Sequence, residues 1–264
     1  MIEDKRAEDA DLLLVDAGDF LRGKGSANIL KAQYMAKAMS RMGYDAINLG
    51  REEVALGIDE IRRLRNLQRL PMVSSNVLQR SGEQLLVLPY LIKRVGGSEF
   101  LGFRYGGVKV ALIGLTVFGE RDVMRRMVPP DLKVASAGET LQATLEKLHG
   151  HCDVVVVLSD LDLEQAKKLA REMEGIDLFF IGGGARNKHF EEIESTIFVY
   201  PAKKGDELGD IELMLDEQRD VQTFSVEWTL LDTSYADDPE MTRLIESYKE
   251  ERKKLQKKPP EPLQ

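Results

Sequence analysis

The hydrophobic residues in the first two thirds of the chain gather in short runs, separated by longer amphipathic stretches. Each run is rich in Val, Ile and Leu with little alternation, which is typical of strands buried on both faces. The runs cover residues 11–18, 45–50, 70–77, 108–116, 152–160 and 176–184. The stretches between them predict helices at about 27–42, 58–68, 137–149 and 162–173. This alternation predicts a layered α/β fold.

The final third of the chain has a different pattern. Residues 195–215 and 221–232 alternate apolar and polar side chains, which predicts antiparallel strands with one face in water. No internal repeat and no linker rich in Gly, Ser or Pro divides the chain. We therefore predict one domain over residues 1–236, followed by a C-terminal helix and tail over 237–264.

The terminal helix is expected from about Pro239 to Lys254. Asp237 or Asp238 is its predicted N-cap, and proline stands at or near the first helical position. The tail "KKLQKKPPEPLQ" is expected to fray. The helix is amphipathic, so residues 239–254 are also a candidate docking element for a protein partner.

The composition excludes several classes of function. The formal net charge is −8 and no long basic stretch precedes the tail, so a nucleic-acid-binding surface is not expected. The one cysteine, Cys152, excludes an intramolecular disulfide and a cysteine-cluster zinc site. No apolar run approaches the roughly 20 residues that span a bilayer, and "MIEDKRAEDA" lacks the apolar core of a signal peptide.

Polar and glycine-rich segments follow most of the predicted strands. In an α/β sheet, ligands collect at the carboxyl edge of the strands, so these segments are the candidate functional loops. They read "AGDFLRG", "LGREE", "SSN", "LSDLDLEQ" and "GGGARNKH".

Seven segments in order carry a family resemblance. They read "LLVDAGDFLRG", "MGYDAINLGREEVALG", "PMVSSNV", "VKVALIGLT", "VVVLSDLDLEQ", "GIDLFFIGGGAR" and "KKGDELGDIEL". Their order and spacing, from about Asp11 to Trp228, resemble the metallophosphatase domain of the bacterial 5′-nucleotidase family, in the calcineurin-like phosphoesterase superfamily. The resemblance implies an α/β/β/α-like sandwich and, in the family, a pair of metal ions that activates water and clamps a phosphate.

The metal-site motifs of the family are altered in this chain. Asp19 matches the aspartate that bridges the two metals and is retained, whereas five other matched positions have changed. Arg51 stands for the ligating asparagine and Glu52 for the catalytic histidine of "GNHE", Asp160 for the histidine of "LSH", and Gly184 and Arg186 for the histidines of "GHxH". A guanidinium cannot donate to a metal and repels one. We therefore expect the dimetal centre, and any other cofactor, to be absent.

The beginning of the chain also departs from the family. Family domains open with a strand carrying Asp-x-His and then a helix, but only about ten residues precede the first strand here. We expect these residues to be the end of that helix, in a domain truncated at its N-terminus. An upstream signal peptide would place the protein in the periplasm or cell envelope. Without such a peptide, we expect the protein in the cytoplasm.

Six carboxylates are expected near the altered cleft, and two interpretations are open for them. They could hold one hard cation such as Mg²⁺ or Ca²⁺, or form a salt-bridge network with Arg22, Arg51 and Arg186, which is the interpretation we favour. The carboxylates are Asp16, Asp19, Glu52, Glu53, Asp160 and Asp162.

Two further motifs suggest ligand chemistry. Gly183, Gly184 and Arg186 could cradle an anion such as a nucleotide-like phosphate, with Arg51 and Asn76 nearby. Relict loop geometry explains these glycines equally well. The motif "HGHC" at 149–152 contains residue types that bind metals. It precedes a strand at the edge opposite the cleft, so we assign it a structural role.

These observations lead to two hypotheses. The first is a nucleotidase-like protein that has lost dimetal phosphoester hydrolysis and acts as a binding or assembly module. The alternative is a divergent phosphoesterase that uses one or two divalent metals (Mn, Zn, Mg or Ca), with its remaining ligands in a missing N-terminal segment. The genuine upstream sequence would discriminate between them.

Overall fold

The computed structural model describes residues 1–8, 11–21, 25–100, 103–118, 128–182, 190–201 and 205–257. Its helices are α1 (Ile2–Glu8), α2 (Ser26–Met42), α3 (Arg51–Val54), α4 (Ile58–Gln68), α6 (Ala137–Leu148), α7 (Leu163–Glu172) and α8 (Pro239–Lys257). Its strands are β1 (Val15–Asp16), β2 (Ala46–Asn48), β3 (Met72–Val73), β4 (Val77–Gln79), β5 (Gln84–Leu85), β6 (Tyr90–Val95), β7 (Ser98–Phe100), β8 (Phe103–Tyr105), β9 (Val108–Leu115), β10 (Leu132–Val134), β11 (Val154–Ser159), β12 (Leu178–Ile181), β13 (Phe190–Ile193), β14 (Thr196–Val199), β15 (Glu207–Leu215) and β16 (Val221–Leu230).

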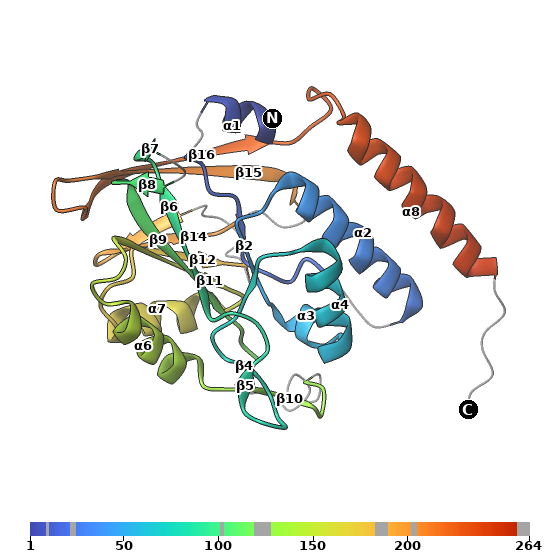
Figure 1. Ribbon diagram of the computed structural model, residues 1–264, viewed down its shortest axis with the longest axis horizontal. Helices are drawn as coiled ribbons and strands as arrows, with labels where there is room; N and C mark the ends of the chain where they lie inside the picture. The colour runs from blue at the N-terminus through green and yellow to red at the C-terminus, as the bar shows by residue number, and fades with distance from the viewer. Residues whose placement is uncertain are drawn as a thin grey trace.

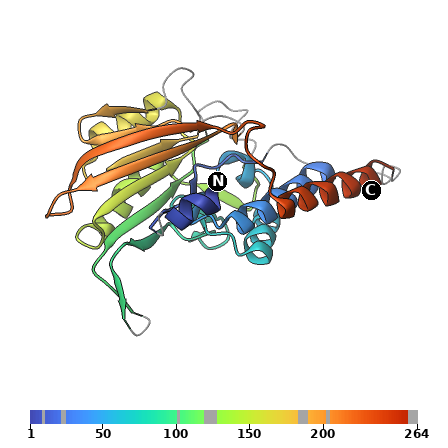
Figure 2. The same cartoon turned by 90° about the horizontal axis from the view of Figure 1, so that it is seen from above.

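A six-stranded sheet forms the middle of the fold. Its order is β13-β14-β12-β11-β9-β6, in which β14, β12, β11 and β9 run parallel and the two edge strands run antiparallel. Helices α6 and α7 cover one face, and the long β15–β16 ribbon covers the other (Figures 1 and 2). This stacking confirms the predicted layered α/β fold.

A smaller parallel sheet, β1-β2-β3, stands beside the large one. It is joined to β9 through hydrogen bonds at its carboxyl end, where Ser75 N donates to Gly114 O. Residue 114 must be glycine, because a Cβ there would lie 2.3 Å from the Val73 carbonyl oxygen. The two sheets therefore meet closely enough for their carboxyl edges to build one site.

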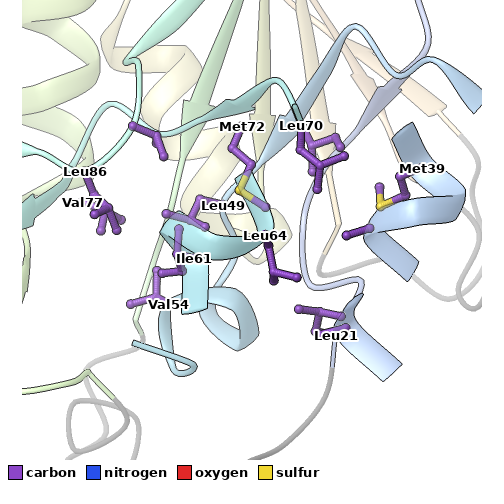
Figure 3. Packing of buried hydrophobic residues seen from close by; sticks show 14 of the residues in the cluster. Leu21, Met39, Leu49, Val54, Ile61, Leu64, Leu70, Met72, Val77 and Leu86 are labelled. Carbon is purple, nitrogen blue, oxygen red and sulfur yellow. The ribbon is translucent and has the colours of Figure 1, made fainter. Parts of the chain in front are cut away.

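The core explains why the predicted helices form. Leu141 and Leu148 of α6 are buried against the six-stranded sheet and Leu145 packs on the same cluster, so residues at i, i+4 and i+7 form one apolar stripe. Around the small sheet, Leu49 and Val54 flank the turn into α3 and pack in one cluster with Ile61 and Leu64 of α4 (Figure 3). Apolar side chains thus anchor the loops that carry the polar site.

Most predicted strands and helices are present, but several predictions need correction. The pattern missed β5, β6, β7, β8, β10 and β13, and only Val15–Asp16 of the run 11–18 pairs as a strand. Residues 196–199 were predicted to have one wet face, but β14 is buried throughout and extends the parallel sheet beside β12. The reason is position, since β14 lies between β12 and β13 and is covered on both faces.

The terminal helix α8 begins at Pro239, and Asp238 is its N-cap because its Oδ1 accepts a hydrogen bond from Met241 N at 2.8 Å. The helix continues to Lys257, so the first residues of the expected frayed tail are helical. It lies along α2 (Figure 1), where the Tyr248 and Tyr34 rings are 5.5 Å apart and Tyr34 Oη donates to Glu251 at 2.9 Å.

Candidate functional site at the carboxyl edge of the strands

The loops that follow β1, β2, β9 and β11 converge at one place, as the sequence predicts. The turn after β1 has Gly18 at φ +97° and Asp19 at φ +62°. Left-handed backbone is open to glycine and tolerated by aspartate, so this turn suits its residues. A Cβ on Gly50, which follows β2, would lie 2.5 Å from both Asp19 N and Asp19 Oδ1. The two loops are therefore in direct backbone contact.

Arg51 lies between two carboxylates from different loops. Its Nη2 donates to Asp19 Oδ2 at 3.2 Å, and its Nε is 3.4 Å from Asp160 Oδ2. Asp160 is fully buried, while Arg51 and Asp19 are about one quarter exposed. The predicted salt-bridge network is therefore present around Arg51. Arg22 and Arg186 lie outside the described residues.

Backbone N–H groups engage the same two carboxylates. Asp19 Oδ1 accepts from Glu52 N at 3.0 Å, and Asp160 Oδ2 accepts from Arg51 N at 2.9 Å, so both aspartates cap the start of α3. Asp160 Oδ1 also accepts from Val117 N at 2.8 Å. Each carboxylate oxygen of the pair thus receives at least one hydrogen bond from the protein.

Glu53 holds the loops after β1 and β2 together through hydrogen bonds to their backbone. Its carboxylate is buried and accepts from Asp19 N at 2.9 Å, Gly50 N at 3.0 Å and Leu21 N at 3.0 Å. Sequence reasoning placed Glu53 in the carboxylate cluster but missed this role. The signal was the spacing of a capping box, with Glu53 three residues after Gly50, hidden because glycine has no side chain to complete the motif.

The electrostatic cost of this arrangement appears in the pKa values. Burial raises the pKa of Asp160 to about 7, and the charge of Asp19 adds to this effect, while Arg51 and two N–H groups oppose it. Burial also raises the pKa of Glu53 well above its usual value. Burial lowers the pKa of Arg51, but Asp160 and Asp19 outweigh it and raise the pKa. Arg51 is therefore a permanent cation in the cleft.

Three other predicted site residues have different roles or cannot be placed. Asn76 was predicted to bind a ligand, but it is fully buried and its Nδ2 donates to Thr116 O at 2.7 Å and to Ala135 O at 3.1 Å. Both amide hydrogens are used inside the protein, so this prediction is corrected. Gly183 and Gly184 lie outside the described residues.

Two carboxylates of the predicted cluster act locally. Asp162 is the N-cap of α7, because its Oδ1 accepts from Gln165 N at 2.9 Å. Asp16 Oδ1 accepts from Gly18 N at 2.8 Å and shapes the turn before Asp19. These hydrogen bonds give both carboxylates a structural role, which is to stabilise a helix start and a turn.

The metal ions that the resemblance implies do not fit the described residues. The guanidinium of Arg51 is already within 3.4 Å of Asp19 and Asp160 and would repel a cation bound to them. Within the described ranges, no group of three or more His, Cys, Asp or Glu is arranged to hold a metal ion. No step through a metal is therefore derived for this cleft.

Comparison with known proteins finds relatives among the 5′-nucleotidases. A 5′-nucleotidase of Vibrio parahaemolyticus is 31% identical over 120 residues, which are 44% of this chain and 20% of that protein. The trifunctional nucleotide phosphoesterase of Bacillus subtilis is 25% identical over 95% of this chain and 19% of its own length. No protein-family model matches the chain.

Solved structures give the same result for the fold. The 5′-nucleotidase precursor of Thermus thermophilus superimposes with a TM-score of 0.80 at 22% identity, over 97% of this chain and 53% of that one. A calcineurin-like phosphoesterase of Bacillus subtilis gives 0.75 at 21% identity, over 97% and 88%. The chain is similar in sequence to 5′-nucleotidases and has the fold of these solved metallophosphoesterase structures.

These comparisons confirm the resemblance found in the sequence. The chain spans about one fifth of the length of the Vibrio 5′-nucleotidase and of the trifunctional Bacillus protein, so what those whole proteins do is not carried over to it. Among the described residues, no helix is long and apolar enough to cross a membrane.

Proposed function

We propose that this metallophosphatase domain does not hydrolyse phosphoesters by the dimetal route and acts as a binding or assembly module. The observation that carries the proposal is Arg51, whose guanidinium lies within 3.4 Å of both Asp19 and Asp160. A cation built into the chain takes the position between the two carboxylates. Arg51 therefore supplies positive charge to both carboxylates from within the chain.

The loop contacts support the same proposal. A residue that activates water must be free to exchange protons with it, and Asp160 is fully buried with both oxygens hydrogen-bonded. Glu53 is equally committed to three backbone N–H groups. These carboxylates hold the loops together, which is the work of a scaffold.

The test is a metal and activity measurement on the purified chain. The protein is loaded with excess Mn²⁺ and desalted, and bound metal per chain is measured by elemental analysis. Hydrolysis of AMP and of p-nitrophenyl phosphate is followed in parallel. We expect metal near zero and hydrolysis at the rate of the enzyme-free control.

The variant Asp19→Asn is the matched control for any activity that appears. Close to two metals per chain, together with hydrolysis that Asp19→Asn abolishes, would overturn the proposal. That result would support the alternative, a divergent metal-dependent phosphoesterase. Activity that survives Asp19→Asn would point to a contaminating phosphatase. In that case the metal content per chain decides between the proposal and the alternative.

A further inference from the structure

Helix α8 lies beside α2 at the outer edge of the molecule (Figures 1 and 2). A groove of about 210 Å³ runs along its N-terminal half, and all the residues that line the groove come from 237–249. Met241, Ile245, Glu246 and Lys249 are among them. We propose that this face of α8 binds the α8 helix of a second copy of the chain in antiparallel orientation.

The charge of α8 changes sign along its length. Residues 237–247 contain four acidic residues and one basic residue, whereas residues 248–257 contain five basic and two acidic residues. Two parallel copies of the helix would place like charges side by side. Two antiparallel copies place each acidic half along a basic half, where opposite charges attract. Charge complementarity therefore favours a second copy as the occupant, and it favours one orientation.

The helix dipole explains only part of this distribution. It favours acidic residues in the first turn and basic residues in the last turn, and the effect falls off beyond those turns. Glu246 and Lys249 are near the middle of α8, away from both ends, and both line the groove. The dipole therefore accounts for the charges at the ends of α8 and leaves those at its centre to another interaction.

A two-fold axis between Ser247 and Tyr248 brings the two halves together. Glu246 of one copy is then opposite Lys249 of the other, and the symmetry repeats this pair. Met241 and Ile245 give the groove apolar surface for the aliphatic stems of the basic side chains of the second copy. A helix of 19 residues is roughly 28 Å long, so the interface is small. We therefore expect a weak dimer, with a dissociation constant of about 10–300 μM.

The experiment is sedimentation velocity of the full chain, from about 5 μM to about 500 μM, at low ionic strength, where exposed charges are screened least. The parent should pass from monomer to dimer across this range. Glu246→Lys and Lys249→Glu each place like charges at both central contacts, so each should weaken the dimer at least about tenfold. Both residues are exposed on a helix, so the variants are expected to fold, which circular dichroism checks.

The decisive variant combines Glu246→Lys with Lys249→Glu, because the exchange restores opposite charges only in an antiparallel pair. Its dimer should be within about threefold of the parent in affinity. Lys168→Glu, at an exposed position of α7, makes the same charge change outside α8 and should leave the dimer unchanged. A parent that stays monomeric, single variants that dimerise as well as the parent, or a combined variant that fails to recover would each overturn the inference. The readout is mass in solution, so it is independent of the proposed loss of hydrolysis.

Discussion

At the scale of single residues, Arg51 decides the character of the carboxyl-edge site. Its backbone N–H and its guanidinium both interact with Asp160, and the guanidinium also reaches Asp19. One residue thus joins the loops that follow β1, β2 and β11. Removing its side chain leaves two carboxylates without their cation, one of them fully buried.

The variant Arg51→Ala tests this account. We expect it to lower the free energy of unfolding by roughly 2–4 kcal/mol, because an uncompensated buried charge is costly and partial exposure of Asp19 reduces the cost. Urea denaturation measures the change. Added Mn²⁺ should restore part of the lost stability in this variant and leave the parent chain unaffected.

Arg63→Ala is the control, since Arg63 pairs with Glu60 one turn away on α4 and is half exposed. A surface pair of this kind contributes about 0.5 kcal/mol or less. Equal losses in the two variants would refute a special role for Arg51.

Sequence reasoning identified Asp19, Arg51 and Asp160 as neighbours because strand order places their loops at one edge. It predicted ligand binding for Asn76 and missed that its amide hydrogens donate to carbonyls of residues 116 and 135. Such bonds depend on how loops that are distant in sequence approach each other in the fold. This approach produces no periodic pattern of residues along the chain. The same holds for Glu53, whose partners include Asp19 and Leu21, more than thirty residues away.

At the scale of elements, α8 is held to the domain mainly through α2. Tyr248 contacts the buried Tyr34, and Glu251 accepts from the Tyr34 hydroxyl. Ile245, on the same helix, is 51% exposed. The packed stripe of α8 is therefore narrow, with few anchoring side chains.

The variant Tyr248→Ala should loosen α8 while the rest of the domain stays folded. Loss of the aromatic pair and its packing costs about 1.4 kcal/mol, so amide hydrogens of residues 239–257 should exchange about tenfold faster. Hydrogen–deuterium exchange with mass spectrometry measures this. Ile245→Ala should leave the rates unchanged; if both variants behave alike, α8 is not anchored through Tyr248.

The elements that the sequence predicted best are those with strong local patterns. The bounds of α4, α6 and α7 are within one or two residues of the prediction, because each has an apolar stripe of helical period. β6 was missed because its apolar residues are interrupted by Lys93 and Arg94, and an edge strand needs little apolar content. β14 was misread because burial by neighbouring strands is a property of the sheet.

At the scale of the whole molecule, buried carboxylates make stability depend on pH. Burial raises the pKa of Asp16 to about 6, the Gly18 N–H opposes this, and the charge of Asp19 adds to it. The folded state therefore holds this proton more tightly than the unfolded state, whose aspartates titrate near 4. The contribution of Asp16 to stability is present at low pH and is lost as the pH rises through about 6.

The variant Asp16→Asn should consequently gain stability relative to the parent as the pH rises from about 4 to about 6. Denaturant unfolding of both proteins across this range measures the difference. Glu83→Gln provides a control of opposite sign, because the Lys133 hydrogen bond lowers the pKa of Glu83. Its deficit relative to the parent should shrink as the pH falls, and a shared trend for both variants would contradict the assignment.

The position of Arg51 has a consequence for how the cleft comes into being. The positive charge that pairs with Asp19 and Asp160 is encoded in the polypeptide, so every copy of the chain receives it during synthesis. Its supply does not depend on uptake, storage or competition with other proteins for scarce ions. Arg51 is therefore present beside these carboxylates in ion-poor and ion-rich surroundings alike.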